Sequence, residues 1–246
     1  MKMYELGLDA SVDETILQMI SELNENTRCY KEMLIELIRV FYEIQESGSV
    51  SSLQLAMVEA AMMTSWEYTN FHWSGKYAMW LSNDFEEVEN FLLRLWKTGN
   101  GTTRQKLVSF LDANPSEKVA NTILTAALSD RAKWVRGSAI GIISKLGYKQ
   151  YLPLLSERCK VEKDATIRAA IENCIDIITL GYRLQPQAGG MTMIYYKKPQ
   201  GTIMLMVYED ELEYFVTDSY VQKINNGEPF FMPENAVKTR KLSIGS

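Results

Sequence analysis

The chain has a single histidine, and it lies in the most aromatic stretch, SWEYTNFHWSGKYAMW, which runs from Ser65 to Trp80. A histidine among aromatic side chains could act as a general base or line a ligand pocket. His72 has no second histidine with which to share a metal, no carboxylate at helical spacing to orient it and no nucleophile beside it. We therefore interpret His72 as a structural residue.

The aromatic residues around His72 favour packing over catalysis. Trp73, Tyr77 and Trp80 are spaced by four and three residues, which places them on one face of a helix and is typical of a core stripe. The tryptophan and phenylalanine before them fall in a predicted loop, where they either close a junction between helices or contact a partner. With the cationic segment around Trp134, they give the candidate partner-binding residues: Trp66, Phe71, His72, Trp73, Arg131, Lys133 and Trp134.

Other catalytic chemistry is sparse in the sequence. Cys29, Cys159 and Cys174 are far apart, and no two cysteines stand at metal-ligand spacing. No glycine-rich phosphate loop and no nucleophile-elbow motif is present. We therefore expect no metal and no cofactor, assign no catalytic residue and favour a protein without enzymatic activity.

The composition is that of a folded protein, with 246 residues, 46% hydrophobic and 23% charged. No secretory leader is apparent in the first residues, and no apolar run approaches the length that spans a bilayer. Three widely spaced cysteines argue against a disulfide framework. These features predict a cytoplasmic protein that does not enter a membrane.

The net charge of −5 is unevenly distributed. Residues 1–83 carry 5 basic and 12 acidic side chains, residues 84–183 carry 15 and 12, and residues 184–246 carry 6 and 7. Proteins that bind duplex DNA usually concentrate basic charge on one surface. The small basic surplus in the middle makes nucleic acid an unlikely partner, whereas the acidic first third suits a basic protein.

Three segments in the middle of the chain repeat: TRQKLVSFL from Thr103, VRGSAIGII from Val135 and IRAAIENCI from Ile167. Their arginines, Arg104, Arg136 and Arg168, are 32 residues apart, and apolar residues follow each arginine after three, six and seven positions. That spacing forms one stripe of a helix. The intervening segments have helical spacing too, so three antiparallel helix pairs are predicted: about 84–98 with 102–113, 116–129 with 133–146, and 149–160 with 165–180.

Residues at the predicted helix ends support this division. Asp84 with Glu87 and Asn114 with Pro115 are typical of helix starts, and Gly99 and Gly147 are typical of helix ends. A two-helix unit cannot bury its apolar stripe alone, so stacked units form a solenoid.

The segment DRAKWVRGSAIGIISKLGYKQYLPLL, from Asp130 to Leu155, resembles a HEAT repeat. An aspartate precedes a Val-Arg pair, alanine and isoleucine follow, Leu-Gly closes the helix, and a proline lies in the next helix. The resemblance is best over residues 84–181. It implies that the arginines form hydrogen bonds between repeats with partners such as Asp130; the alternative is a row of cations that faces phosphates. Gly137 and Gly141 indicate close approach of a neighbouring helix.

The two ends differ from the middle. Residues 11–64 predict three irregular helices, with capping boxes at Ser11 and Ser51, so that residues 1–83 continue the solenoid. Residues 185–190 resemble a linker, and 191–197, 202–208 and 211–217 are rich in strand-forming residues. We expect a mainly α protein: a HEAT-like solenoid over 84–183 and a small antiparallel sheet over 184–246. Its methionines are expected to pack against the last helices; the alternative is a methionine-lined, adaptable binding surface.

Solenoids usually bind other proteins on a concave surface, and small acidic bacterial HEAT-like proteins include immunity proteins that neutralise a cognate toxin. The expected function is therefore protein binding, with a basic toxin as one expected partner. A general scaffold or adaptor fits nearly as well. The resemblance also offers a HEAT-like alkylbase DNA glycosylase, in which Arg131, Lys133, Trp134 and Arg136 would line a DNA groove, and, with less residue support, a bilin lyase. The low isoelectric point, 5.2, argues against the glycosylase, and no aspartate can be matched to its catalytic one.

Overall fold

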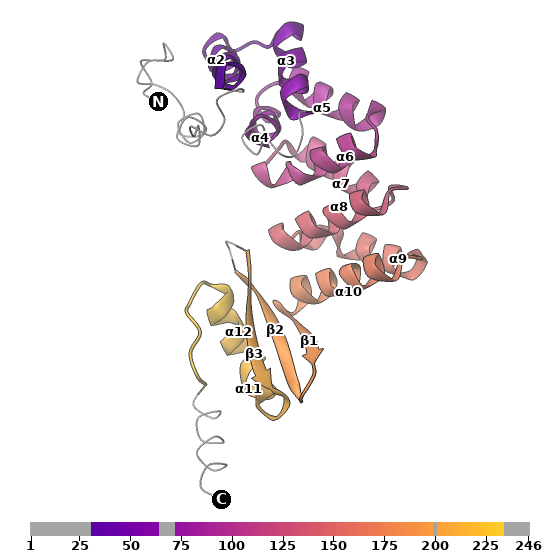
Figure 1. The fold of residues 1–246 in the computed structure, drawn as a ribbon, viewed down its shortest axis with the longest axis vertical. Coiled ribbons are helices and arrows are strands. Elements are labelled where there is room, and N and C mark those ends of the chain that lie inside the picture. Colours follow the sequence, from indigo (N-terminus) through magenta and orange to yellow (C-terminus); the bar gives the residue numbers. More distant parts are fainter. Residues whose placement is uncertain (1–30, 64–71, 199–200, 234–246) are drawn as a thin grey trace, which may run out of the picture. The chain divides into compact units, whose positions relative to one another are not determined.

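The computed structural model describes residues 31–63, 72–198 and 201–233 (Figure 1). Over these residues the protein is mainly helical, with one three-stranded antiparallel sheet towards the C-terminus, as predicted. The chain divides into two compact units, Met1–Ala139 and Ile140–Ser246, and the division falls within a helix. The solenoid and the domain boundaries drawn from the sequence stay predictions.

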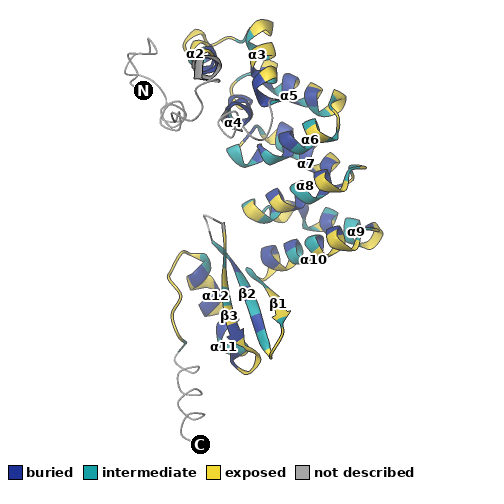
Figure 2. Cartoon of the chain, in the orientation of Figure 1, coloured by how far each residue is buried: buried dark blue, intermediate teal, exposed yellow. Residues whose placement is uncertain are grey.

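The first unit contains α2 to α7 and the start of α8. Its helices are α2 (Lys31–Ser47), α3 (Ser52–Met62), α4 (His72–Leu81), α5 (Glu86–Thr98), α6 (Gly101–Ser109), α7 (Glu117–Ala127) and α8 (Lys133–Leu146), with a short 3-10 helix, η4 (Leu111–Ala113), after α6. Each of α2 to α4 packs on the next helix, and α5 contacts both α6 and α7. Figure 2 shows buried residues on the sides of these helices that face their neighbours.

The apolar stripes of the sequence form the core of this unit. On α2, Leu37, Ile38 and Phe41 are buried, as their helical spacing predicts. The repeat positions after the first arginine, Leu107 and Phe110, are buried as well. Burial of these side chains is what fixes the helices, because short helices are only marginally stable alone.

Helix α4 approaches its neighbour at a glycine. A β-carbon built on Gly75 would lie 2.2 Å from the ring of Phe110, so only a residue without a side chain fits there. Gly141 on α8 was expected to serve the same purpose, and this prediction is wrong: nothing lies within 4 Å of a β-carbon built there.

Two predicted helix starts are also wrong. The N-cap of α5 is Phe85, without a side-chain bond, because the backbone of Asp84 closes the end of α4 by donating to Leu81 O. Before α7, Asn114 is left-handed (φ 54°) and ends η4, and the N-cap is Ser116. The capping box at Ser51 is confirmed, and Gly147 follows α8 with the positive φ expected of a helix end.

The second unit contains the end of α8, a helix pair and the sheet. The elements are η5 (Lys149–Tyr151), α9 (Leu152–Val161), α10 (Ala165–Thr179), β1 (Tyr182–Gln187), β2 (Met191–Lys198), β3 (Gly201–Tyr208), η6 (Glu209–Glu211), α11 (Leu212–Phe215) and α12 (Asp218–Asn225). Strand order is β1-β2-β3, and all pairing is antiparallel. Helices α9 and α10 pack on each other, and α12 packs on β2.

The sheet differs from the prediction at both of its ends. Residues 211–217 were expected to form a strand but are mostly helical, because Glu211 and Phe215 lie four apart and are both buried. Residues 185–187, the first half of the predicted linker, belong to β1 (Tyr182–Gln187). Its Pro186 is compatible with a strand because β1 is an edge strand, where an N–H group is not needed for pairing.

One face of the sheet is buried against helices and the other is open. Ile194, Tyr196 and Val207 form a cluster with side chains of α11 and α12, and Tyr196 donates a 2.8 Å hydrogen bond to Phe215 O. Met204 and Met206 lie on the opposite face and are exposed, so the prediction that they pack against the last helices is wrong.

Candidate protein interface

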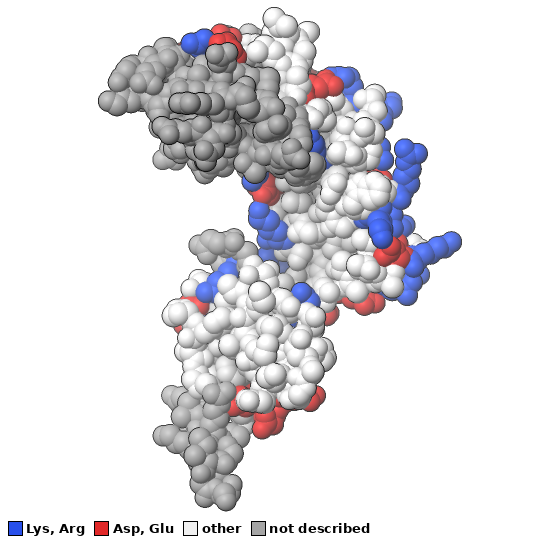
Figure 3. All heavy atoms as spheres, in the orientation of Figure 1, with Lys and Arg blue, Asp and Glu red and all other residues white. Residues whose placement is uncertain are grey.

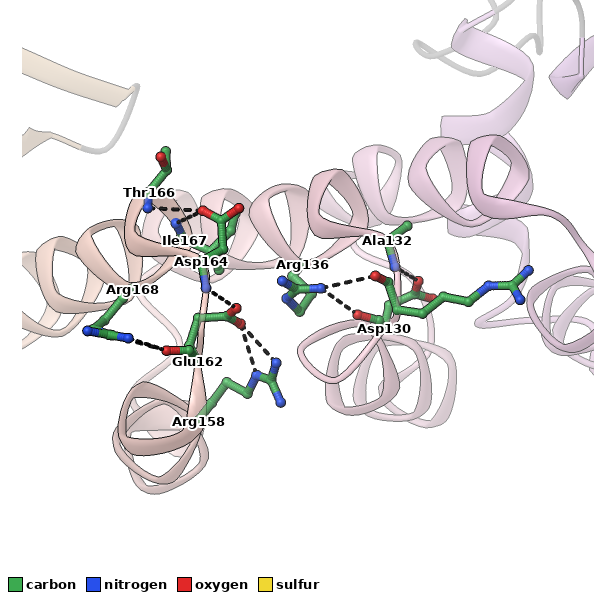
Figure 4. Close-up of polar contacts among 10 residues, drawn as sticks. Asp130, Ala132, Arg136, Arg158, Glu162, Asp164, Thr166, Ile167 and Arg168 are labelled. Carbon is green, nitrogen blue, oxygen red and sulfur yellow. Dashed lines mark hydrogen bonds and ion pairs between the residues drawn. The ribbon is translucent and has the colours of Figure 1, made fainter.

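The three repeated arginines all bind the loop that precedes their own helix. Arg104 donates to Gly99 O at 2.7 Å, Arg136 to Asp130 O at 2.8 Å and Arg168 to Glu162 O at 2.6 Å. The acceptor lies five or six residues before the arginine in each case, so the recurrence in the sequence corresponds to a recurring bond. Figure 4 shows the bonds of Arg136 and Arg168. These guanidinium groups hold the turn between two helices closed.

Asp130 completes this network in the first unit. Its carboxylate accepts two hydrogen bonds from Arg104, at 2.5 Å and 3.2 Å, and a third from the backbone of Ala132 at 2.7 Å. Burial alone would raise the pKa of Asp130, but the hydrogen bonds from Arg104 and Ala132 and the positive charges of Arg104 and Arg131 hold it below its ordinary value. The structure thus contains a hydrogen-bonded pair of Arg104 with Asp130, the partner that the resemblance suggested.

Glu162 stands 32 residues after Asp130, in the second unit, and its arginine partner, Arg158, is only four residues away. It is buried, accepts two hydrogen bonds from Arg158 and accepts another from the backbone of Asp164 at 3.0 Å (Figure 4). Asp164 in turn caps α10 by accepting from Thr166 N and Ile167 N. The charged residues of these loops thus bond mainly to one another and to the backbone, which does not favour a row of cations aimed at phosphates.

Trp134 differs from these residues because its side chain is exposed. Just over half of its surface, 53%, is accessible, although it stands in the first turn of α8. The indole lies over the first turn of α6: a β-carbon built on Gly101 would be 3.5 Å from Trp134 Nε1 and Cζ2.

Two cationic residues come just before this tryptophan in the sequence. Arg131 and Lys133 are exposed on either side of Ala132, in the loop and first residue of α8. The starts of α6 and α8 meet under the indole, and both helix dipoles present their positive end there. We name Arg131, Lys133, Trp134 and Gly101 the Trp134 surface. It can bind an acidic group beside an apolar one.

The other candidate residues cannot be placed in this surface. Trp66 and Phe71 lie outside the described residues, and His72 and Trp73 are described only as the first backbone residues of α4. Further along α4, Tyr77 is buried, and its ring lies 4.3 Å from that of Phe41. The core interpretation of this stripe is confirmed at Tyr77.

The cysteines in the described segments are poorly suited to nucleophilic chemistry. Cys174 is buried, its Sγ lies 3.6 Å from Ile140 O, and burial raises its pKa to about 12. Burial and the neighbouring Glu172 raise the pKa of Cys159 as well. A raised pKa removes the thiolate that would attack a substrate.

No group of three or more His, Cys, Asp or Glu side chains could hold a metal ion among residues 31–63, 72–198 and 201–233. None of the helices in those ranges combines the length and apolar character needed to cross a bilayer.

The outer face of the sheet, with Met204, Met206 and Tyr208, is an exposed surface that the sequence offered only as the less favoured alternative. The sequence does indicate which residues share this face, because every second side chain of β3 points to the same side of the sheet. Methionines at those positions suggested a core because methionine is apolar.

No family model, no curated protein and no solved structure matches this chain. The candidate interface therefore depends on its own geometry.

Proposed function

We propose that this chain is a non-enzymatic protein-binding helical protein and that the Trp134 surface is its contact site. The observation that carries the proposal is the exposed Trp134 on the first turn of a regular helix. Tryptophan and arginine are the residues most enriched where protein interfaces have their largest binding energies. An indole held over Gly101 loses little conformational entropy when a partner covers it.

The partner that fits the Trp134 surface carries a carboxylate next to an apolar side chain. Arg131 and Lys133 supply positive charge, and the positive ends of two helix dipoles add to it. The indole N–H can donate to the same acidic segment. An acidic peptide or an acidic edge of a folded protein has this chemistry.

A HEAT-like arrangement of the helices is part of the proposal. It is supported by the 32-residue recurrence of the arginines and of their bonds to the preceding loop. Repeats of this kind present successive loops on one edge, and the Trp134 surface belongs to such a loop.

The test is affinity capture from cells that express the protein, with the wild type and with Trp134→Ala as baits. We expect one or more proteins that the wild type retains and Trp134→Ala loses by at least tenfold. Leu53→Ala, which truncates another exposed apolar side chain, is the matched control and should retain them. Equal recovery on all three baits would contradict the assignment of the surface.

The acidic first third supports a second candidate, neutralisation of a basic toxin. Residues 1–83 carry 5 basic and 12 acidic side chains, and Glu36, Glu43 and Glu46 are exposed on α2. Opposite charge accelerates association and favours such a partner. An immunity gene should directly follow a toxin gene, and co-expression should restore growth to cells that make the toxin. A general scaffold would show neither result.

The structure favours a DNA glycosylase less, because Arg136 donates to the backbone at Asp130 and Arg131 instead of standing free in a groove. Binding to a methylated duplex at low salt would support that function, since phosphate contacts are strongest there.

A further inference from the structure

The two edges of the C-terminal sheet are built differently. β1 has six residues, contains Pro186 and Arg183, and is contacted by α10. β3 has eight residues, Gly201–Tyr208, without proline or charge, and within the described part of the chain it pairs only with β2. Natural sheets protect their edges with proline, charge or cover, and β3 has the first two nowhere along its length.

The face beside this edge is apolar although it is open to solvent. Opposite residues of β2 and β3 form the pairs Met191 with Tyr208, Met193 with Met206, and Tyr195 with Met204. Met204, Met206 and Tyr208 are 59%, 48% and 56% exposed. The open face of an antiparallel sheet is usually polar, so an apolar one indicates an interaction surface.

The other face of the sheet is already occupied. Ile194 and Val207 pack with Phe215, Tyr220 and neighbouring side chains of α11 and α12. A strand that pairs with β3 must therefore place its own apolar side chains on the open face of the sheet. This requirement restricts the register in which the new strand can pair.

The ends of β3 carry opposite charges. Lys198, the last residue of β2, lies opposite Gly201 at the start of β3. Its ammonium donates to the carbonyls of Gly227 and Glu228, which are uncharged acceptors and do not neutralise it. Glu209 and Asp210 are exposed directly after Tyr208. Figure 3 shows basic side chains towards one end of this unit, with some acidic ones beside them, only acidic ones at the other end and a largely uncharged surface between.

We propose that β3 pairs antiparallel with β3 of a second copy of this chain. In that arrangement the start of one strand lies beside the end of the other, so that Lys198 of each copy meets Glu209 and Asp210 of its partner. A two-fold axis at Leu205 places Met204 opposite Met206 of the other copy and keeps the helix-covered faces on one side. The same patch then serves both copies, as a closed dimer requires.

The test is sedimentation equilibrium of the full chain over a range of micromolar concentrations. We expect a mass of twice 28.2 kDa for the wild type. The double variant Met204→Lys with Met206→Lys sets lysines opposite one another across the new pair, so its dissociation constant should rise at least tenfold. Met232→Lys, at another exposed methionine outside the sheet, should leave the mass unchanged.

Charge reversal tests the antiparallel arrangement separately. Glu209→Lys with Asp210→Lys should weaken the dimer, and adding Lys198→Glu to the same chain should restore it. Circular dichroism identifies a variant that fails to fold. A wild type that stays monomeric, a methionine double variant with unchanged mass, or a triple variant without recovery would overturn the proposal, which is independent of the Trp134 surface.

Discussion

The loops of the repeated helices and the outer face of the sheet use their side chains in opposite ways. The loops are rich in charge, yet Arg104, Asp130 and Glu162 are engaged with one another or with the backbone. On the sheet face Arg183 stacks on Tyr195, and Met204 and Met206 beside them are exposed. Charged residues at repeated positions here hold the loops of the fold, whereas the apolar residues that stay exposed are the positions where we propose contacts with a partner.

The largest loss of stability is expected when the carboxylate of Asp130 is removed from the loop network. Asp130→Ala leaves the largely buried guanidinium of Arg104 without its carboxylate, and the loss of one partner from such a pair typically costs about 3 kcal/mol. Urea unfolding should show this loss. Glu157→Ala removes the exposed pair with Lys160 and should cost less than about 0.5 kcal/mol. Equal losses would show that the network does not stabilise the fold.

Close packing in the helical region gives the next effect. Gly75→Ala forces a β-carbon into the ring of Phe110, and overpacking of this kind costs about 1–3 kcal/mol. Gly141→Ala meets nothing and should stabilise its helix by about 0.5–1 kcal/mol. Thermal unfolding of the two variants should therefore move in opposite directions from the wild type.

Low pH should remove the contribution of Asp130 to the free energy of unfolding. Its pKa is lowered in the folded protein, so its stabilisation is complete above the unfolded value, about 4, and is lost as the pH falls through the folded value. The difference in unfolding free energy between the wild type and Asp130→Asn should stay constant from pH 7 to about pH 5 and shrink below that. A difference that persists at pH 2 would assign the stabilisation to something other than the charge.

The smallest effect is expected on the sheet face. Met206→Thr truncates a half-exposed side chain, so we expect a change in stability within about 0.5 kcal/mol. This change is measured by chemical unfolding at a protein concentration low enough for the proposed dimer to dissociate. A loss above about 2 kcal/mol would mean that Met206 belongs to the core of its own unit.

The sequence predicted the helices well wherever its apolar periodicity was strong. The six predicted helices correspond to α5 to α10, because burial of a regular stripe determines where a helix forms; the predicted pairing is confirmed for α5 with α6 and for α9 with α10. The caps were predicted less well: Asp84 and Asn114 favour helix starts, but their backbones close the preceding turns.

The C-terminal unit was predicted only in part. β2 and β3 were found from their composition, whereas β1 was missed because Pro186 is typical of a turn. Residues 211–217 contain strand formers, but tertiary packing of Phe215 outweighed that preference. Exposure of Trp134 and of the methionines depends on which neighbours fold against them, and periodicity alone does not give this.

Site-specific photo-crosslinking tests the central claim most directly. A photoreactive phenylalanine replaces Trp134 in one preparation and Leu53 in another, both exposed positions in the first unit. After irradiation in cells, the variant with the label at position 134 should form one discrete crosslinked product with a second protein. The peptide of that protein that carries the crosslink should be acidic. Absence of any species at position 134, or the same species at both positions, would contradict the account.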